Sequence, residues 1–167
     1  MSRNILITGG SGYLGGSLLQ HLKDEGSLPP HDTIYGLVRS EDQAKQTETY
    51  YGVTPMYLDL SNQDSITKTL LDKQVSIVFF LIDAMESETQ VRFIKALGAV
   101  GRRLGISTHF LHTSGAKMFS SLVVMPTERS LSDADPSMYE LQKSAHPDVP
   151  FMQTVRQSRF SGFDWSD

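Results

Sequence analysis

The sequence contains no cysteine among its 167 residues. Disulfide bonds, thiolate metal sites and cysteine nucleophiles are therefore excluded, and the absence is compatible with a reducing compartment. No apolar run approaches the roughly 18 residues that a membrane-spanning helix needs. No basic-then-apolar leader precedes the first apolar run, so we expect no signal peptide and a cytoplasmic protein.

The sequence also has no excess of basic over acidic residues. Fifteen lysines and arginines stand against 19 acidic residues, which gives a net charge of −4. No basic face stands out, so we expect neither nucleic acid nor a membrane as a partner. His109 and His112 lie three apart on an expected strand and would face opposite sides, so we expect structural roles for them and no metal site.

Apolar runs alternate with helical patterns along the chain, which is typical of a doubly wound α/β fold with a parallel sheet. A chain of this length can bury a core as one domain. The expected strands are 4–8, 33–38, 53–58, 75–82 and 108–113, and the expected helices lie near 14–22, 40–49, 63–72, 87–104 and 135–145.

Capping and stop residues delimit these helices. The residues are Ser40 with Gln43 as a capping box, Ser61 or Asn62 as a cap, Gly26 and Gly105 as stops, and Asp135-Pro136 as a helix start. In the longest helix, four apolar residues recur at helical spacing and are expected to face the core. They are Val91, Ile94, Leu97 and Val100.

A glycine-rich turn follows the first strand and precedes an amphipathic helix. It reads Thr8-Gly9-Gly10-Ser11-Gly12-Tyr13-Leu14-Gly15. Such a turn lets the backbone approach a pyrophosphate, which then rests on the positive end of the helix. The context of strand, turn and helix favours a dinucleotide site over the alternative of a purely structural turn.

The pattern T-G-x-x-G-x-x-G resembles the short-chain dehydrogenase/reductase superfamily in its extended and atypical branches, over about residues 3–157. The resemblance implies a Rossmann-like sheet in the order 3-2-1-4-5, truncated before the substrate domain. It implies a dinucleotide-binding domain over 1–157 and a divergent tail over 158–167. The cofactor contacts that it implies around the turn are Thr8, Gly9, Gly12, Tyr13, Leu14 and Gly15, with Leu81 after the fourth strand.

The choice of cofactor depends on the end of the second strand. NAD enzymes usually place an acid there, whereas NADP enzymes offer an arginine. Here Arg39 and Ser40 follow the strand, which predicts NADP(H), with a solvated surface arginine as the alternative. Asp59 and Leu60 resemble the family's adenine contact, and the alternative is a simple lead-in to the next helix.

The resemblance also implies a catalytic set of Ser114, Tyr139 and Lys143. Tyr139 follows Ser114 by 25 residues, and Tyr139 and Lys143 share one helix face. A nearby ammonium favours the phenolate form of a tyrosine, so Tyr139 would pass a proton while Ser114 hydrogen-bonds the substrate carbonyl. In the alternative, Tyr139 packs over the sheet edge and Lys143 is solvated.

The expected truncation leaves an open sheet edge at the fifth strand. Open edges and apolar patches invite pairing. We therefore expect a homodimer through this edge or the flanking helices, in which the partner subunit could complete the substrate pocket. In the alternative, the tail folds back with Phe160, Phe163 and Trp165 over the apolar surface.

Three functions are compatible with these residues. The first is an NADP(H)-dependent oxidoreductase that acts on a small carbonyl or alcohol substrate. The second is a redox-neutral enzyme, such as a cyclase or isomerase, which the truncation favours, as do the large Ile82 and Asp83 where the family often has small residues near the ribose. The third is a non-enzymatic dinucleotide-binding regulator, like the nitrogen-metabolite-repression regulators of this superfamily.

Overall fold

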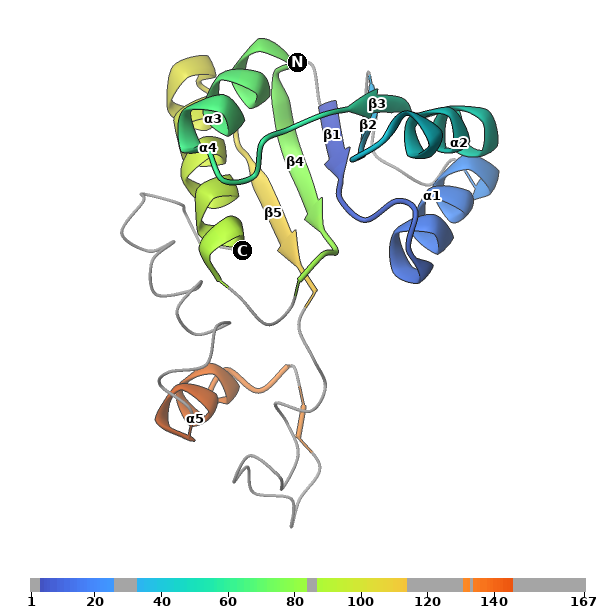
Figure 1. Cartoon of the computed structure of the whole chain (residues 1–167). Helices are drawn as coiled ribbons and strands as arrows, with labels where there is room; N and C mark the ends of the chain where they lie inside the picture. The colour runs from blue at the N-terminus through green and yellow to red at the C-terminus, as the bar shows by residue number, and fades with distance from the viewer. Residues whose placement is uncertain (1–3, 26–32, 84–86, 114–130, 133, 146–167) are drawn as a thin grey trace.

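A computed structural model describes residues 4–25, 33–83, 87–113, 131–132 and 134–145. These residues form a five-stranded sheet in the order β3-β2-β1-β4-β5, in which all neighbouring strands run parallel (Figure 1). The expected fold class and strand order are therefore confirmed. The elements are β1 (Asn4–Ile7), α1 (Tyr13–Glu25), β2 (Ile34–Leu37), α2 (Glu41–Tyr51), β3 (Thr54–Met56), α3 (Gln63–Asp72), β4 (Val75–Phe80), α4 (Glu88–Leu104), β5 (His109–His112) and α5 (Met138–Ala145).

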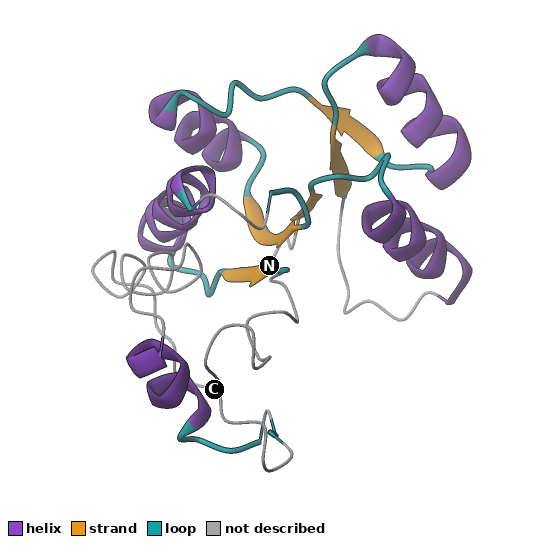
Figure 2. Ribbon diagram, turned by 60° about the horizontal axis from the view of Figure 1, so that its bottom comes forward, coloured by secondary structure: helices purple, strands orange, loops and turns teal. Residues whose placement is uncertain are grey.

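Alternating side chains of the central strands build a core on each face of the sheet. Leu6 of β1 packs with the α3 and α4 side chains, whereas Ile5 and Ile7 pack on the α1 side. Helices α1 and α2 accordingly lie on one face of the sheet, and α3 and α4 lie on the other (Figures 1 and 2). The four residues of α4 that the periodicity places inward, Val91, Ile94, Leu97 and Val100, are all buried. Within the described ranges no helix is both long and apolar enough to cross a membrane.

Most capping predictions are confirmed. The Ser40 side chain accepts a hydrogen bond from the Gln43 backbone N–H at the start of α2, so Ser40 is the cap. The Gln43 side chain accepts from the Arg39 N–H and not from the Ser40 N–H, so the second bond of the predicted capping box is not formed. Asn62, rather than Ser61, caps α3 by accepting from Ser65. Gly105 ends α4 in the left-handed conformation, with φ of 65°, a region that favours glycine. Gly26 lies outside the described residues.

The last helix begins later than the sequence predicts. Asp135 and Pro136 were expected to start it, but α5 begins at Met138. The Asp135 carboxylate accepts hydrogen bonds from the backbone N–H and the hydroxyl of Ser137, at 2.9 and 2.6 Å. The bond from the Ser137 N–H is of the kind that an N-cap residue accepts, and the Met138 N–H donates to the Asp135 carbonyl at 3.0 Å. Residues 135–137 therefore form a capped turn that leads into α5.

The start of the central strand β1 is hydrogen-bonded to the segments beside it. At its start, the Asn4 amide donates to the Lys73 carbonyl at 2.7 Å and accepts from the Thr33 N–H at 3.0 Å. These bonds join the segments that enter β2 and β4. The register between β1 and β4 shifts after Asn4, and Ser76 is the extra residue. The strands are therefore aligned before they reach the carboxyl edge of the sheet.

The end of β5 packs against an aromatic cluster. The His112 ring lies 6.1 Å from the Phe80 ring, between centroids, and Phe80 also contacts Phe93 and Phe110. His109 is exposed on the other face of the strand, as the spacing predicts. Burial lowers the pKa of His112, because a charged imidazolium is disfavoured away from water.

This shift predicts a dependence of stability on pH. The ordinary pKa is 6.5, so below that pH the unfolded chain binds a proton on His112 before the folded protein does. The free energy of unfolding should therefore fall as the pH decreases from about 7 to about 5. Urea denaturation across this range should give a flatter profile for His112→Gln, whereas the exposed control His109→Gln should keep the wild-type slope. Equal slopes for all three proteins would contradict the prediction.

Candidate functional site

The glycine-rich turn joins β1 to α1 at the carboxyl edge of the sheet (Figure 1). Gly9 adopts a left-handed conformation, with φ of 71°. Its carbonyl accepts from the Gly12 N–H at 2.9 Å, and the Gly12 carbonyl accepts from the Gly16 N–H at 2.8 Å. The turn therefore passes directly into the hydrogen bonding of α1.

Two of the predicted glycines are required, Gly15 by a close contact and Gly9 by its backbone conformation. A Cβ on Gly15 would lie 2.1 Å from the Gly9 carbonyl oxygen, so no side chain fits there. At Gly9 the positive φ of 71° is what favours glycine, and a Cβ would in addition lie 3.0 Å from the side-chain atom Cγ2 of Ile82. Gly15 thus lets α1 begin against the end of β1, and Gly9 lets the segment after β4 approach the turn.

Thr8 links the glycine turn to the end of β4. Its side chain is buried, and its hydroxyl accepts from the Leu81 N–H at 2.8 Å. Its own N–H donates to the Phe79 carbonyl at 3.0 Å. Thr8 and Leu81, both predicted site residues, are therefore adjacent at the point where the strand order reverses, which is where ligands of open α/β sheets bind.

Ile82 and Asp83 continue this segment. Ile82 packs against the core on the α3 and α4 side. Asp83 is exposed, with φ of 50°, and its carbonyl accepts from the buried Gln90 amide at 2.6 Å. Gln90 therefore fixes the path of the chain after β4. The expected crowding of a ribose by Ile82 and Asp83 stays a prediction.

The start of α1 differs electrostatically from the other helix starts. Its first turn contains no acidic residue, whereas each of the other helices has at least one there. Tyr13 and Leu14, the first two helical residues, are 89 % and 52 % exposed. The partial positive charge of the helix end is thus left without a carboxylate and can attract an anion.

The turn between β2 and α2 is tied to the glycine turn. Arg39 and Ser40 are both exposed. The Gln43 side chain accepts from the Arg39 N–H at 2.9 Å and donates to the Ser11 hydroxyl at 3.4 Å. The Tyr57 hydroxyl donates to the Ser40 carbonyl at 3.5 Å. In the described part of the chain, no carboxylate pairs with the Arg39 guanidinium.

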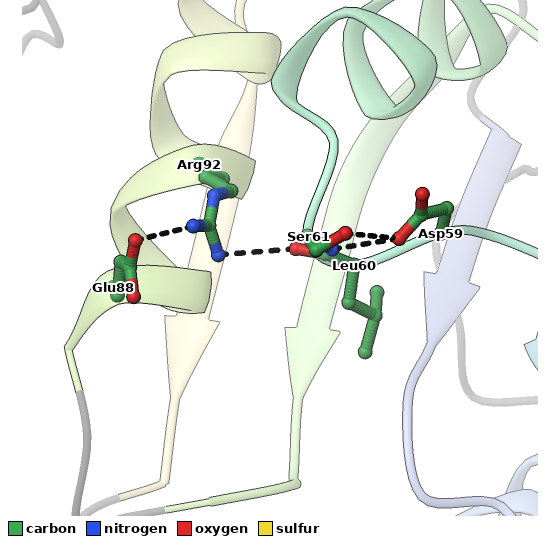
Figure 3. A network of polar contacts seen from close by, with 5 residues as sticks. All are labelled: Asp59, Leu60, Ser61, Glu88 and Arg92. Carbon is green, nitrogen blue, oxygen red and sulfur yellow. Dashed lines mark hydrogen bonds and ion pairs between the residues drawn. The ribbon is translucent and has the colours of Figure 1, made fainter.

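Asp59 and Leu60 lie in the segment between β3 and α3 (Figure 3). The Asp59 carboxylate accepts from the hydroxyl and the backbone N–H of Ser61, at 2.6 and 3.0 Å. These two hydrogen bonds lower the pKa of Asp59, because they stabilise its charged form. The segment is therefore a fixed turn that presents an ionised carboxylate.

Arg92 of α4 holds the same segment from the other side. Its guanidinium donates to the Leu60 carbonyl at 3.1 Å and pairs with Glu88 one turn earlier (Figure 3). In return, the Gln63 amide donates to the Arg92 carbonyl at 3.1 Å. The two helices α3 and α4 are thereby cross-linked next to the predicted adenine contact.

The structure does not bring the predicted catalytic set together within the described residues. Ser114 lies outside them, and only the backbone of Tyr139 is described. Lys143 is on α5, where its ammonium pairs with Glu140 at 3.1 Å. In Figure 1, α5 lies beyond the carboxyl edge of the sheet, apart from the glycine turn. The predicted tail over 158–167, with Phe160, Phe163 and Trp165, also lies outside the described residues.

An open depression of about 500 Å³ lies elsewhere, between α1 and the end of α2. Ser17, His21 and Tyr51 line it, together with Gly16 and Gln20. None of the predicted site residues lines this depression. The candidate site is therefore defined by the turns at the carboxyl edge.

Four residues of this site were not predicted from the sequence. They are Ser11, Tyr57, Arg92 and Gln43, which was predicted only as part of a helix cap and not as a link between two turns. Ser11 lies inside the glycine motif, so its position alone is a usable signal. The long-range partners of Gln43 and Arg92 have no signal in the sequence, because they depend on how α2 and α4 pack.

Comparison with known proteins settles the family. A sequence model described as the NAD dependent epimerase/dehydratase family matches residues 5–146. The chain belongs to this family. The family is an extended branch of the short-chain dehydrogenase/reductase superfamily, so the resemblance predicted from the glycine turn is confirmed.

Curated relatives of this epimerase/dehydratase chain include isoflavone reductase homologues from tobacco species. The homologue A622 of Nicotiana tabacum is 35 % identical over 104 residues, which are 58 % of this chain and 31 % of the relative. The homologue of Nicotiana glauca is 32 % identical over 103 residues, with the same coverage. The aligned region therefore spans about a third of the length of these relatives.

Solved structures share the fold. Leucoanthocyanidin reductase of Vitis vinifera, solved with NADPH, superposes with a TM-score of 0.60 at 19 % identity, over 96 % of this chain and 45 % of that one. Triphenylmethane reductase of Citrobacter sp., complexed with NADP(H), has a TM-score of 0.56 at 21 % identity, over 96 % and 46 %. At these identities the likeness shows the fold alone.

The contact at Gly15 yields a matched pair of variants. Gly15→Ala should lose binding of NADPH and NADH and lower the free energy of unfolding by about 1–3 kcal/mol or more, because its Cβ meets fixed backbone. In Gly16→Ala the nearest atom is the Tyr51 hydroxyl at 3.0 Å, at the end of a side chain that can move. This variant should stay within about 1 kcal/mol of wild type. Fluorescence titration and urea denaturation measure both effects, and equal behaviour of the two variants would contradict the assignment.

Proposed function

We propose that this protein is an NADP(H)-dependent oxidoreductase that acts on a small carbonyl or alcohol substrate. The observation that carries the proposal is Arg39, which stands unpaired with any carboxylate in the described residues where NAD enzymes usually place an acid. Ser40 lies beside it, and Gln43 joins both to the glycine turn. A cationic group and a hydroxyl therefore border the start of α1.

The donor set suits a 2′-phosphate. A guanidinium presents several N–H groups in a fixed fork that matches phosphate oxygens, and the Ser40 hydroxyl adds a further polar group. An acid in place of Arg39 would instead repel that phosphate. The space that Gly15 keeps free of a side chain fits the pyrophosphate, which would rest on the first turn of α1.

The adenine would lie between the turns after β2 and β3. Asp59 offers an ionised carboxylate, which accepts hydrogen bonds such as those of an exocyclic amine. Tyr57 is 53 % exposed on the neighbouring segment and offers an aromatic face. The Thr8 and Leu81 pair would border the nicotinamide ribose. The similar proteins support this proposal, since several are reductases and two were solved with NADPH or NADP(H).

The chemistry would fall to the residues after β5. When bound, NADPH supplies the hydride that reduces a carbonyl carbon. The Ser114 hydroxyl would donate a hydrogen bond to the carbonyl oxygen, and the Tyr139 hydroxyl would give that oxygen its proton. Lys143, four residues later on α5, would favour the phenolate that Tyr139 becomes and so assist the transfer.

A dinucleotide-binding regulator is the second candidate, and the ion pair between Lys143 and Glu140 favours it. An ammonium that is neutralised by a carboxylate stabilises a phenolate less than a free one does. A redox-neutral enzyme that reuses the same cleft is a further alternative. Such an enzyme would convert its substrate without any net oxidation or reduction of a nicotinamide cofactor.

Cofactor preference tests the role of Arg39. Wild type should bind NADPH at least tenfold more tightly than NADH, and Arg39→Ala should weaken NADPH binding by about 1.5–3 kcal/mol while NADH binding changes little. Arg103→Ala removes the same charge from the last turn of α4, away from the turn after β2, and is the control. Fluorescence titrations at constant ionic strength provide the measurement. Preference for NADH, or an unchanged preference in Arg39→Ala, would refute the NADP(H) assignment.

Turnover tests the catalytic role of Tyr139. With a carbonyl substrate found by screening, Tyr139→Phe should lose about a hundredfold or more of the NADPH-dependent rate and keep NADPH affinity, because only the proton donor is removed. Tyr50→Phe, on the exposed side of α2, is the matched control. Full activity in Tyr139→Phe would exclude this mechanism. Binding without turnover in wild type would favour the regulator, and turnover without nicotinamide would favour the redox-neutral enzyme.

A further inference from the structure

Gln43 is the one described residue whose side chain bonds to both of the turns that would surround the ribose phosphate. Its Oε1 accepts from the Arg39 N–H at 2.9 Å. Its Nε2 donates to the Ser11 hydroxyl at 3.4 Å, across 32 positions of sequence. Its backbone N–H also donates to the Ser40 hydroxyl, at 3.3 Å.

These bonds fix two parts of the site relative to each other. Ser11 belongs to the glycine turn, which follows β1, whereas Arg39 and Ser40 form the turn that follows β2. Ser11, Arg39 and Ser40 are exposed, and the Gln43 amide is a direct hydrogen-bonded link between the two turns. A 2′-phosphate would lie against the second turn and the pyrophosphate against the first, so the span between the turns must match the nucleotide.

We propose that Gln43 is a positioning residue that sets the preference for NADPH over NADH. This inference rests on the proposed function. Gln43 keeps the Arg39 and Ser40 groups at the distance from the glycine turn that a 2′-phosphorylated ribose requires. NADH has no 2′-phosphate to engage these groups, so its binding depends less on their placement.

The chemistry of an amide explains why this residue is a glutamine. The link needs an acceptor for the Arg39 N–H and a donor for the Ser11 hydroxyl, and an amide provides both on one planar group. A glutamate would keep the acceptor, lose the donor and place a negative charge beside the phosphate. A methionine has a similar length and provides neither strong bond.

The main test compares Gln43→Met with Gln46→Met in the whole chain. Gln46 is exposed one turn further along α2, so the control carries the same replacement away from the turns. Dissociation constants for NADPH and NADH are measured by fluorescence titration, and folding is checked by thermal denaturation. Gln43→Met should weaken NADPH binding roughly fivefold to thirtyfold, as expected for one or two lost hydrogen bonds, with about twofold or less for NADH. Gln46→Met should match wild type with both nucleotides.

The outcomes separate this inference from the proposed function. If wild type binds neither nucleotide, or prefers NADH, the proposed function fails and the inference fails with it. If wild type prefers NADPH and Gln43→Met keeps the same preference, only the inference is overturned. An equal loss of NADPH and NADH binding also overturns it, because Gln43 would then support the glycine turn in general.

Two further variants keep the inference testable if Gln43→Met does not fold. Gln43→Glu has nearly the same shape and should still lower NADPH affinity more than NADH affinity, since its charge opposes the phosphate. Ser11→Ala removes the partner of the Nε2 donor and should reduce the preference for NADPH. Combined with Gln43→Met it should add little further loss, because both changes break the same link. Additive losses would show that the two residues act separately and would overturn the proposed bridge.

Discussion

A side-chain carbon on Gly15 would lie 2.1 Å from the Gly9 carbonyl oxygen, and the whole candidate site depends on that space staying empty. The same oxygen accepts the Gly12 N–H that closes the turn, so one atom both shapes the turn and excludes a Cβ. Because the backbone passes so closely, α1 can begin directly at the end of β1. The free N–H groups of its first turn then face the carboxyl edge of the sheet, without an acidic side chain to satisfy them.

The parallel sheet brings the remaining parts of the site to this edge. The central strand β1 is fixed at its start by Asn4 and at its end by Thr8, whose hydroxyl accepts from Leu81. The exposed turns are then secured by side chains rather than by the sheet: Gln43 secures the turn after β2, and Arg92 the turn after β3. The core therefore supports the glycine turn, and single side-chain hydrogen bonds hold the other two turns in place.

The sequence predicted the parts of this arrangement that depend on local chemistry. Apolar periodicity and the capping residues Ser40 and Gly105 each act within a few residues, so the α4 core face and these helix limits were accessible. The sheet order came instead from the family resemblance that the glycine turn carries. The links from Gln43 to Ser11 and from Arg92 to Leu60 cross about 30 positions and exist only once the helices pack. The start of α5 was predicted a little too early, although the Asp135 carboxylate accepts from the Ser137 N–H as a capping residue does.

The separation of the glycine turn from the turn after β2 explains how one fold can serve different nucleotides. The glycine turn and the start of α1 address the pyrophosphate, which NADH and NADPH share, and any change there affects both. Discrimination concerns one phosphate group, so it requires only the few kcal/mol that charge-assisted hydrogen bonds supply. Donors that are already held in place lose less conformational entropy when they bind, so they contribute more of that energy. A glutamine that tethers an arginine turn can therefore tune cofactor preference while the core, the sheet and the glycine turn stay unchanged.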